Sequence, residues 1–206
     1  MSDAPKESAT LITTEHQLTE LVNHIRERGR FAFDTEFVSE ETFEPVLCLI
    51  QVATTDRLAV VDPLAIHNLS SFWDVVLDPN IDVVMHAAGE DLRICHMKTR
   101  EVPRRLFDVQ LVAGLVGYSY PLSLVNLVYQ ILRISLPGSE TRTDWRRRPL
   151  TTAQLRYALD DVRYLLEIED ILRKQLAEMG RETWAEEEIA DFLDSIESRA
   201  EEERWR

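Results

Sequence analysis

Hydrophobic positions follow two different spacings in the first part of the chain. Between residues 14 and 29 they recur every three or four positions, which predicts a helix. The positions concerned are Leu18, Leu21, Val22 and Ile25. Over residues 31–37 apolar and polar side chains alternate instead, as they do in a strand, with Asp34 and Glu36 on the same face. We expect the polar segment 1–11, which precedes the helix, to be flexible.

The next apolar runs predict more strands. Residues 46–53 and 58–61 are nearly continuously apolar and are joined by a short polar link. With the strand at 31–37, they suggest an antiparallel meander. Helix and strand then alternate, with segments at 69–77, 82–86 and 90–98. The chain is therefore predicted to be of the mixed α/β class.

The second half of the chain is predicted to be mainly helical. Helical segments near 108–117 and 122–132 precede a loop at 133–150 that is rich in proline, glycine and arginine. A capping box at 151–154 begins one long helix, whose leucine stripe runs to a stop at Gly180. A last, acidic helix is predicted at 182–203.

Composition favours one folded domain. The chain has 206 residues, 45% of them hydrophobic, and a net charge of −14. Half of this excess lies in residues 177–206, which hold eleven acidic and four basic residues. We therefore expect a domain over residues 12–180 and an acidic helical extension over 181–206.

Cys48 and Cys95 lie in apolar segments without metal-type spacing, and no run approaches the ~20 apolar residues of a membrane span. A cytoplasmic protein with two buried thiols is the expectation.

The paired acids at Asp34 and Glu36 suggest a metal site. Two carboxylates on one face of a buried strand repel each other, and loss of solvent disfavours their ionisation, unless a cation neutralises them. Hard divalent ions such as Mg²⁺ and Mn²⁺ take carboxylate ligands, and two of them about 3.5–4 Å apart can act on a phosphodiester. The alternative is a solvent-facing pair on an edge strand.

Other acids are ambiguous by themselves. Asp91 follows a predicted strand and a glycine turn, where an aspartate also serves as a helix cap or first-turn residue. Tyr157 and Asp161 are four residues apart and therefore share a helix face, although an ordinary tyrosine and a solvated aspartate have the same spacing. Between Asp160 and Asp161, only the face shared with Tyr157 favours Asp161.

Three segments together resemble the exonuclease motifs of the DEDD superfamily in its tyrosine variant. They are FDTEF at 33–37, HAAGEDL at 86–92 and YALDD at 157–161. The flanking segments are similar to ribonuclease D: LCLIQVAT at 47–54, TDWRRRPLTTAQLRYAL at 143–159 and GRETWAEEE at 180–188. The likeness covers about residues 12–190 in order, which is more specific than any single motif.

The resemblance implies a fold, a reaction and a cofactor. The fold would be ribonuclease H-like, with a mixed central sheet flanked by helices. The reaction would be 3′→5′ hydrolysis of RNA to nucleoside 5′-monophosphates. Two Mg²⁺ or Mn²⁺ ions would be held by Asp34, Glu36, Asp91 and Asp161, and Tyr157 would orient the attacking water.

Basic and aromatic residues near these motifs are candidates for nucleic-acid binding. His86 belongs to the second motif, and either a substrate contact or a structural role fits its place at a strand end. Arg142 and Arg148 lie just before the helix of the third motif and could bind phosphates, against the alternative of a solubilising loop. Trp145 and Phe37 are interpreted as packing residues.

The expected function is therefore metal-dependent trimming of single-stranded RNA 3′ ends, such as those of tRNA precursors. Two alternatives are a DNA exonuclease of the same fold and a non-catalytic RNA-binding module. The chain departs from the resembled family in two respects. It carries Leu136-Pro-Gly-Ser139 where a lysine is usual, and no segment resembles the helical HRDC domains of ribonuclease D.

Overall fold

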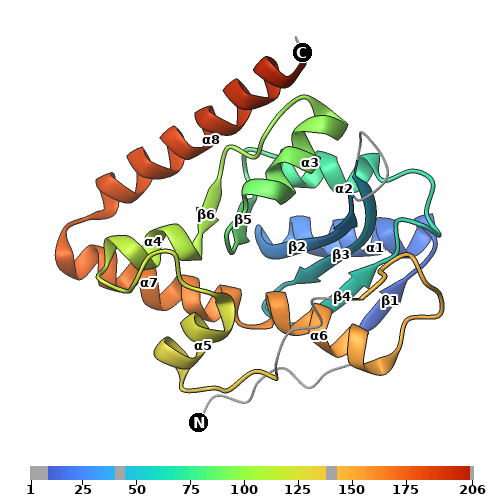
Figure 1. The fold of residues 1–206 in the computed structure, drawn as a ribbon, viewed down its shortest axis with the longest axis horizontal. Coiled ribbons are helices and arrows are strands. Elements are labelled where there is room, and N and C mark those ends of the chain that lie inside the picture. Colours follow the sequence, from blue (N-terminus) through green and yellow to red (C-terminus); the bar gives the residue numbers. More distant parts are fainter. Residues whose placement is uncertain (1–8, 40–44, 138–142, 205–206) are drawn as a thin grey trace.

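A mixed six-stranded sheet forms the centre of the protein (Figure 1). The computed structural model describes residues 9–39, 45–137 and 143–204. In these residues the strand order is β1-β4-β3-β2-β5-β6. The strands are β1 (Thr10–Ile12), β2 (Arg30–Val38), β3 (Val46–Ala53), β4 (Leu58–Val61), β5 (Asp82–Met85) and β6 (Leu106–Asp108).

The pairing confirms the predicted meander and adds two strands. β2, β3 and β4 are joined by antiparallel pairs, and β5 pairs with β2 in parallel. β1 and β6 complete the two edges, each in parallel with its neighbour. The expectation that residues 1–11 are flexible is therefore wrong at Thr10 and Leu11, which belong to β1. Both added strands have three residues, too few to show a period of two.

Eight helices lie in the described part of the chain. They are α1 (Glu15–Arg28), α2 (Ser70–Val76), α3 (Gly89–Thr99), α4 (Val109–Leu115), α5 (Leu124–Leu132), α6 (Thr152–Arg163), α7 (Leu165–Met179) and α8 (Glu182–Arg204). The capping box that begins α6 is present, since the Thr151 and Gln154 side chains each accept from the other's backbone N–H. The single helix predicted up to Gly180 is wrong, because the helix breaks at Tyr164.

The helices cover the two faces of the sheet. One core packs α1, α2, α3 and part of α8 on the face that carries Phe31 and Phe33. The other core packs α4 to α7 on the face that carries Ala32 and Leu49. The break at Tyr164 gives the two neighbouring helices different packing partners. Helix α6 lies over β3 and β4, and α7 lies against α4 and β5.

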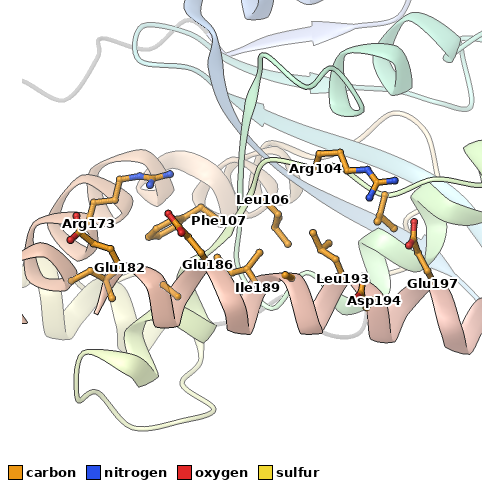
Figure 2. A pocket seen from close by; sticks show the side chains of 14 residues that line it. Arg104, Leu106, Phe107, Arg173, Glu182, Glu186, Ile189, Leu193, Asp194 and Glu197 are labelled. Carbon is orange, nitrogen blue, oxygen red and sulfur yellow. The ribbon is translucent and has the colours of Figure 1, made fainter. Parts of the chain in front are cut away.

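The acidic helix α8 docks on the domain. It runs past α3 and β6 (Figure 1), and it contributes Leu193 and Ile196 to the first core. A hollow of about 440 Å³ remains between α8 and β6, where Leu106 and Phe107 face Ile189 and Leu193 (Figure 2). The β6 side chains at this hollow are buried, since Leu106 is 6% and Phe107 is 3% exposed. In the described residues, no helix has the length and apolar character needed to span a membrane.

Candidate active site

Three carboxylates from two distant segments meet above the sheet. Asp34 and Glu36 project from the same face of β2, and Asp161 projects from α6, which packs over β2 and β3. One oxygen from each of the three lies within 4.8 Å of the others. The structure thus brings together residues that are more than 120 positions apart in the sequence, as the motif pattern predicted.

Asp91 lies beside this group, in the first turn of α3. The hydroxyl of Thr35 donates a hydrogen bond of 2.5 Å to Asp91 Oδ1, and Asp91 is only 6% exposed. Its charge acts on Asp34, but it lies outside the 4.8 Å group. The fourth predicted carboxylate is therefore adjacent to the other three and tied to the residue between Asp34 and Glu36.

The turn that leads to Asp91 is fixed by another buried acid, Asp108. Its two carboxylate oxygens accept from the backbone N–H groups of Ala87 (3.2 Å) and Ala88 (2.9 Å), and Ala87 has a left-handed φ of 56°. The same carboxylate caps α4 by accepting from Gln110 N and Leu111 N. The sequence analysis missed Asp108. Its position directly before an amphipathic segment is a helix N-cap signal, but the contact with Ala87 and Ala88 depends on the tertiary fold.

Burial and mutual repulsion raise the pKa values throughout the cluster. The pKa of Asp34 is held well above its usual value, first by loss of solvent and then by the charges of the neighbouring carboxylates. Burial also raises the pKa of Glu36 to about 8, that of Asp161 to about 7 and that of Asp91 to about 6. None of the four forms an ion pair with a cationic side chain within residues 9–39, 45–137 and 143–204.

A divalent cation fits this donor set. Several carboxylates converge without a counter-charge, which is the chemistry that hard cations take. Gln51, opposite Asp34 in the β2–β3 register, is fully buried and places Nε2 3.5 Å from Asp34 Oδ2. Its Oε1 has no hydrogen-bond partner among the described residues. A water bound to a cation would satisfy this acceptor. Gln51 was also missed, because its relation to Asp34 depends on strand register.

Tyr157 stands one helical turn before Asp161, as its spacing predicted. The nearby phenol opposes the rise in the pKa of Asp161. Its ring stacks on Trp145, with centroids 6.1 Å apart and planes inclined by 30°. Trp145 is 5% exposed, so its interpretation as a packing residue is confirmed. Asp160 is directed elsewhere, toward Arg163 Nε at 2.9 Å.

A sequence profile described as 3′-5′ exonuclease matches residues 9–177. The chain belongs to the 3′-5′ exonuclease family. Ribonuclease D of Desulfotalea psychrophila is 39% identical over 180 residues, which are 87% of this chain and 48% of that protein. Ribonuclease D of Xanthomonas oryzae is 37% identical over 194 residues, or 94% of this chain and 53% of that protein. The chain thus spans about half the length of the curated relatives it matches.

Solved structures agree with this assignment to the 3′-5′ exonuclease family. Escherichia coli RNase D, described as an exoribonuclease involved in structured RNA processing, superposes with a TM-score of 0.88 and 34% identity. The match covers 93% of this chain and 51% of that chain. The catalytic core of RRP6 from Trypanosoma brucei gives a TM-score of 0.83 at 25% identity, over 96% of this chain and 55% of that one. The predicted resemblance and the mixed α/β fold are confirmed.

The three residues predicted to bind nucleic acid differ in what the structure shows of them. His86 Nε2 lies 2.9 Å from the Leu122 carbonyl oxygen, and burial lowers the pKa of the imidazole. Arg142 lies outside the described residues. Arg148 makes five hydrogen bonds within the fold, one for each of its N–H groups, so it has none left to donate to a phosphate.

Proposed function

We propose that this chain hydrolyses RNA from the 3′ end and releases nucleoside 5′-monophosphates. The observation that carries the proposal is the convergence of Asp34, Glu36 and Asp161 within 4.8 Å without a cationic partner among the described residues, with Tyr157 one turn from Asp161. Membership of the 3′-5′ exonuclease family and the likeness to ribonuclease D support the reaction and the choice of RNA.

Asp34, Glu36, Asp91 and Asp161 would hold two Mg²⁺ or Mn²⁺ ions. When bound, such ions lower the pKa of water and offset the charge that develops on the phosphate. The protein supplies the geometry. Strand β2 fixes the spacing of Asp34 and Glu36, and the hydrogen bond from Thr35 holds Asp91 next to them. The high pKa values of the metal-free cluster mean that protons and cations compete for the same oxygens.

Tyr157 would orient the attacking water through its hydroxyl. Stacking on Trp145 restricts the ring, and the hydroxyl acts on the Asp161 carboxylate, whose pKa it lowers. A fixed donor beside the reacting phosphate raises the rate by positioning, without any covalent step on the protein. His86 remains a candidate substrate contact. The hydrogen bond between His86 Nε2 and the Leu122 carbonyl holds the backbone at Leu122 next to the start of α3.

The relatives support a proposal for the substrate class. We propose single-stranded 3′ ends of structured RNAs, including tRNA precursors, because the similar Escherichia coli RNase D is described as acting in structured RNA processing. We further propose that residues 12–180 form the catalytic domain and that 181–206 extend it. A cytoplasmic location agrees with Cys48 and Cys95, which are both buried free thiols.

The decisive test is digestion of a 5′-labelled single-stranded RNA with Mn²⁺ or with chelator, beside a DNA strand of the same sequence. We expect a metal-dependent ladder that shortens from the 3′ end, is lost in Asp34→Asn and is slowed in Tyr157→Phe. Asp160→Asn is the matched control, since this neighbouring acid pairs with Arg163 outside the cluster. RNA that is bound but intact in Mn²⁺ would contradict catalysis, and faster loss of the DNA strand would contradict the choice of RNA.

A further inference from the structure

Arg148 is bonded through every one of its five N–H groups. Nε and Nη2 form a bidentate pair with the two oxygens of Asp62, at 2.6 and 2.7 Å. The second N–H of Nη2 donates to the Cys48 carbonyl at 2.9 Å. Nη1 donates to the carbonyls of Trp145 at 2.8 Å and Arg147 at 2.9 Å. A planar guanidinium can make this set of bonds, whereas a lysine ammonium cannot.

The carbonyl of Cys48 belongs to an irregularity in β3 that lies beside Glu36. In the β2–β3 register Glu36 faces Leu49 and Phe37 faces Leu47, so Cys48 is the extra residue of a β-bulge. A bulge changes the local twist and redirects the side chains next to it. The bond from Arg148 therefore fixes the backbone opposite one of the three converging carboxylates.

The other bonds of Arg148 fix the loop that supports Tyr157. Trp145 lies in this loop and stacks on the ring of Tyr157. Asp62, which directly follows β4, is 4% exposed and anchors the loop to the sheet through Arg148. The guanidinium thus joins the β3 bulge, the end of β4 and the Trp145 loop at one point.

We propose that Arg148 is a positioning residue, which sets Glu36 through the β3 bulge and Tyr157 through Trp145. This inference rests on the proposed exonuclease function. It differs from phosphate binding in what it predicts: loss of positioning lowers kcat, whereas loss of a phosphate contact raises KM and weakens the salt dependence of RNA binding. A displacement of about 1 Å at a catalytic group lowers the rate by about 100-fold.

The test compares Arg148→Lys with Asp62→Asn, which disrupts the same contacts without removing a positive charge. We expect both variants to lower kcat by about 10- to 100-fold and to change KM by less than about threefold. Arg147→Gln is the matched control, because it removes a charge from the same loop at a side chain that is 84% exposed. Full kcat in Arg148→Lys would overturn the proposal. A rise in KM alone in Arg148→Lys, without the same change in Asp62→Asn, would also overturn it.

A readout that needs no catalysis separates this inference from the proposed function. The protein is labelled with 3-fluorotyrosine, and the ¹⁹F resonance of Tyr157 is assigned with Tyr157→Phe. We expect Arg148→Lys to shift or broaden this resonance and to leave those of Tyr118 and Tyr129 in place, because Tyr157 is the tyrosine that stacks on Trp145 in the described part of the chain. An unchanged Tyr157 resonance would refute positioning even if the protein is an active nuclease. A wild-type protein without nuclease activity would refute the proposed function. The Tyr157 resonance would still report on whether Arg148 positions the ring.

Discussion

Strand β2 places charged side chains in two different environments that are shielded from solvent. At its start, Arg30 reaches Glu169, whose side chain is fully buried, at 3.3 Å, and Arg173 completes the neutralisation of that carboxylate at 2.7 Å. Farther along the strand, Asp34 and Glu36 meet Asp161, with no ion pair among the described residues. Glu169 is fully buried and the three cluster acids are half-buried, so both groups lose solvent on folding. The counter-charge is what differs.

In the proposed function, this difference separates acids that stabilise the fold from acids that bind cations. Burial raises the pKa of Glu169, but Arg173 and Arg30 oppose the rise. In the cluster the neighbouring groups are themselves acids and add to the rise. A buried acid that is paired with arginine contributes to the fold, whereas converging unpaired acids are costly unless a cation binds them.

The largest expected effect is the loss of activity when one cluster carboxylate is removed. Asp34→Asn should lower the rate of RNA hydrolysis by about 1,000-fold or more, because the amide cannot replace an anionic metal ligand. The same change should raise the free energy of unfolding in chelator by about 1 kcal/mol, since it removes repulsion. Initial rates and urea unfolding measure the two effects. A variant that loses both activity and metal-free stability would show that Asp34 is a structural acid.

Glu169→Gln should have the opposite pattern. Removing the buried charge leaves Arg30 and Arg173 without their shared partner, and we expect a loss of about 2 kcal/mol in stability. This value is below that of a fully buried pair because the Arg30 side chain is 25% and that of Arg173 51% exposed. RNA hydrolysis should remain within about threefold of the wild-type rate. Equal losses of activity in Glu169→Gln and Asp34→Asn would remove the distinction between the two regions.

Periodicity predicted which of the cluster residues share a face, and the resemblance to the DEDD motifs implied that they form one cluster. Alternation along β2 and the four-residue spacing of Tyr157 and Asp161 both survive folding unchanged. The supporting contacts could not be predicted in this way. Thr35, Gln51 and Asp108 act across strand register or between helices, and these relations exist only in the tertiary structure.

Two parts of the fold escaped prediction for a similar reason. β1 and β6 are edge strands of three residues, and their pairing partners define them. The break at Tyr164 interrupts a continuous leucine stripe without proline or glycine, and it arises where α6 and α7 turn to different packing partners. Arg148 shows the limit most clearly, because its basic loop suggested phosphate binding and the fold uses all its donors internally.

The pH dependence of stability should distinguish the two regions again. A carboxyl whose pKa is raised on folding binds its proton more tightly in the folded state, so the free energy of unfolding falls as the pH rises from about 4 to about 8. In chelator we expect this fall to amount to about 1 kcal/mol between pH 5 and pH 8, after discounting for partial exposure of Glu36. With Mn²⁺ the slope should reverse, because cations replace protons on the same oxygens.

Thermal unfolding of the wild type and of Glu36→Gln across this pH range measures the contribution of the cluster. The glutamine variant should show a flatter profile in chelator and a smaller stabilisation by Mn²⁺. Glu169→Gln should keep the Mn²⁺ response of the wild type, because Glu169 lies outside the carboxylate group. A Mn²⁺ response that is unchanged in Glu36→Gln would place the cation elsewhere.

The smallest expected effect concerns the hollow that Arg173 and α8 line together (Figure 2). Arg173 is also a partner of Glu169. Ala190→Leu should place apolar atoms in this hollow and raise the free energy of unfolding by about 0.5 kcal/mol. Ala177→Leu is the matched control, because it makes the same substitution at an exposed helical alanine away from the hollow. Urea unfolding should show the gain for Ala190→Leu alone, with nuclease rates unchanged in both variants. A change in the nuclease rate of Ala190→Leu would mean that α8 is coupled to the carboxylate cluster. The coupling would run through α3, which packs against α8 and carries Asp91.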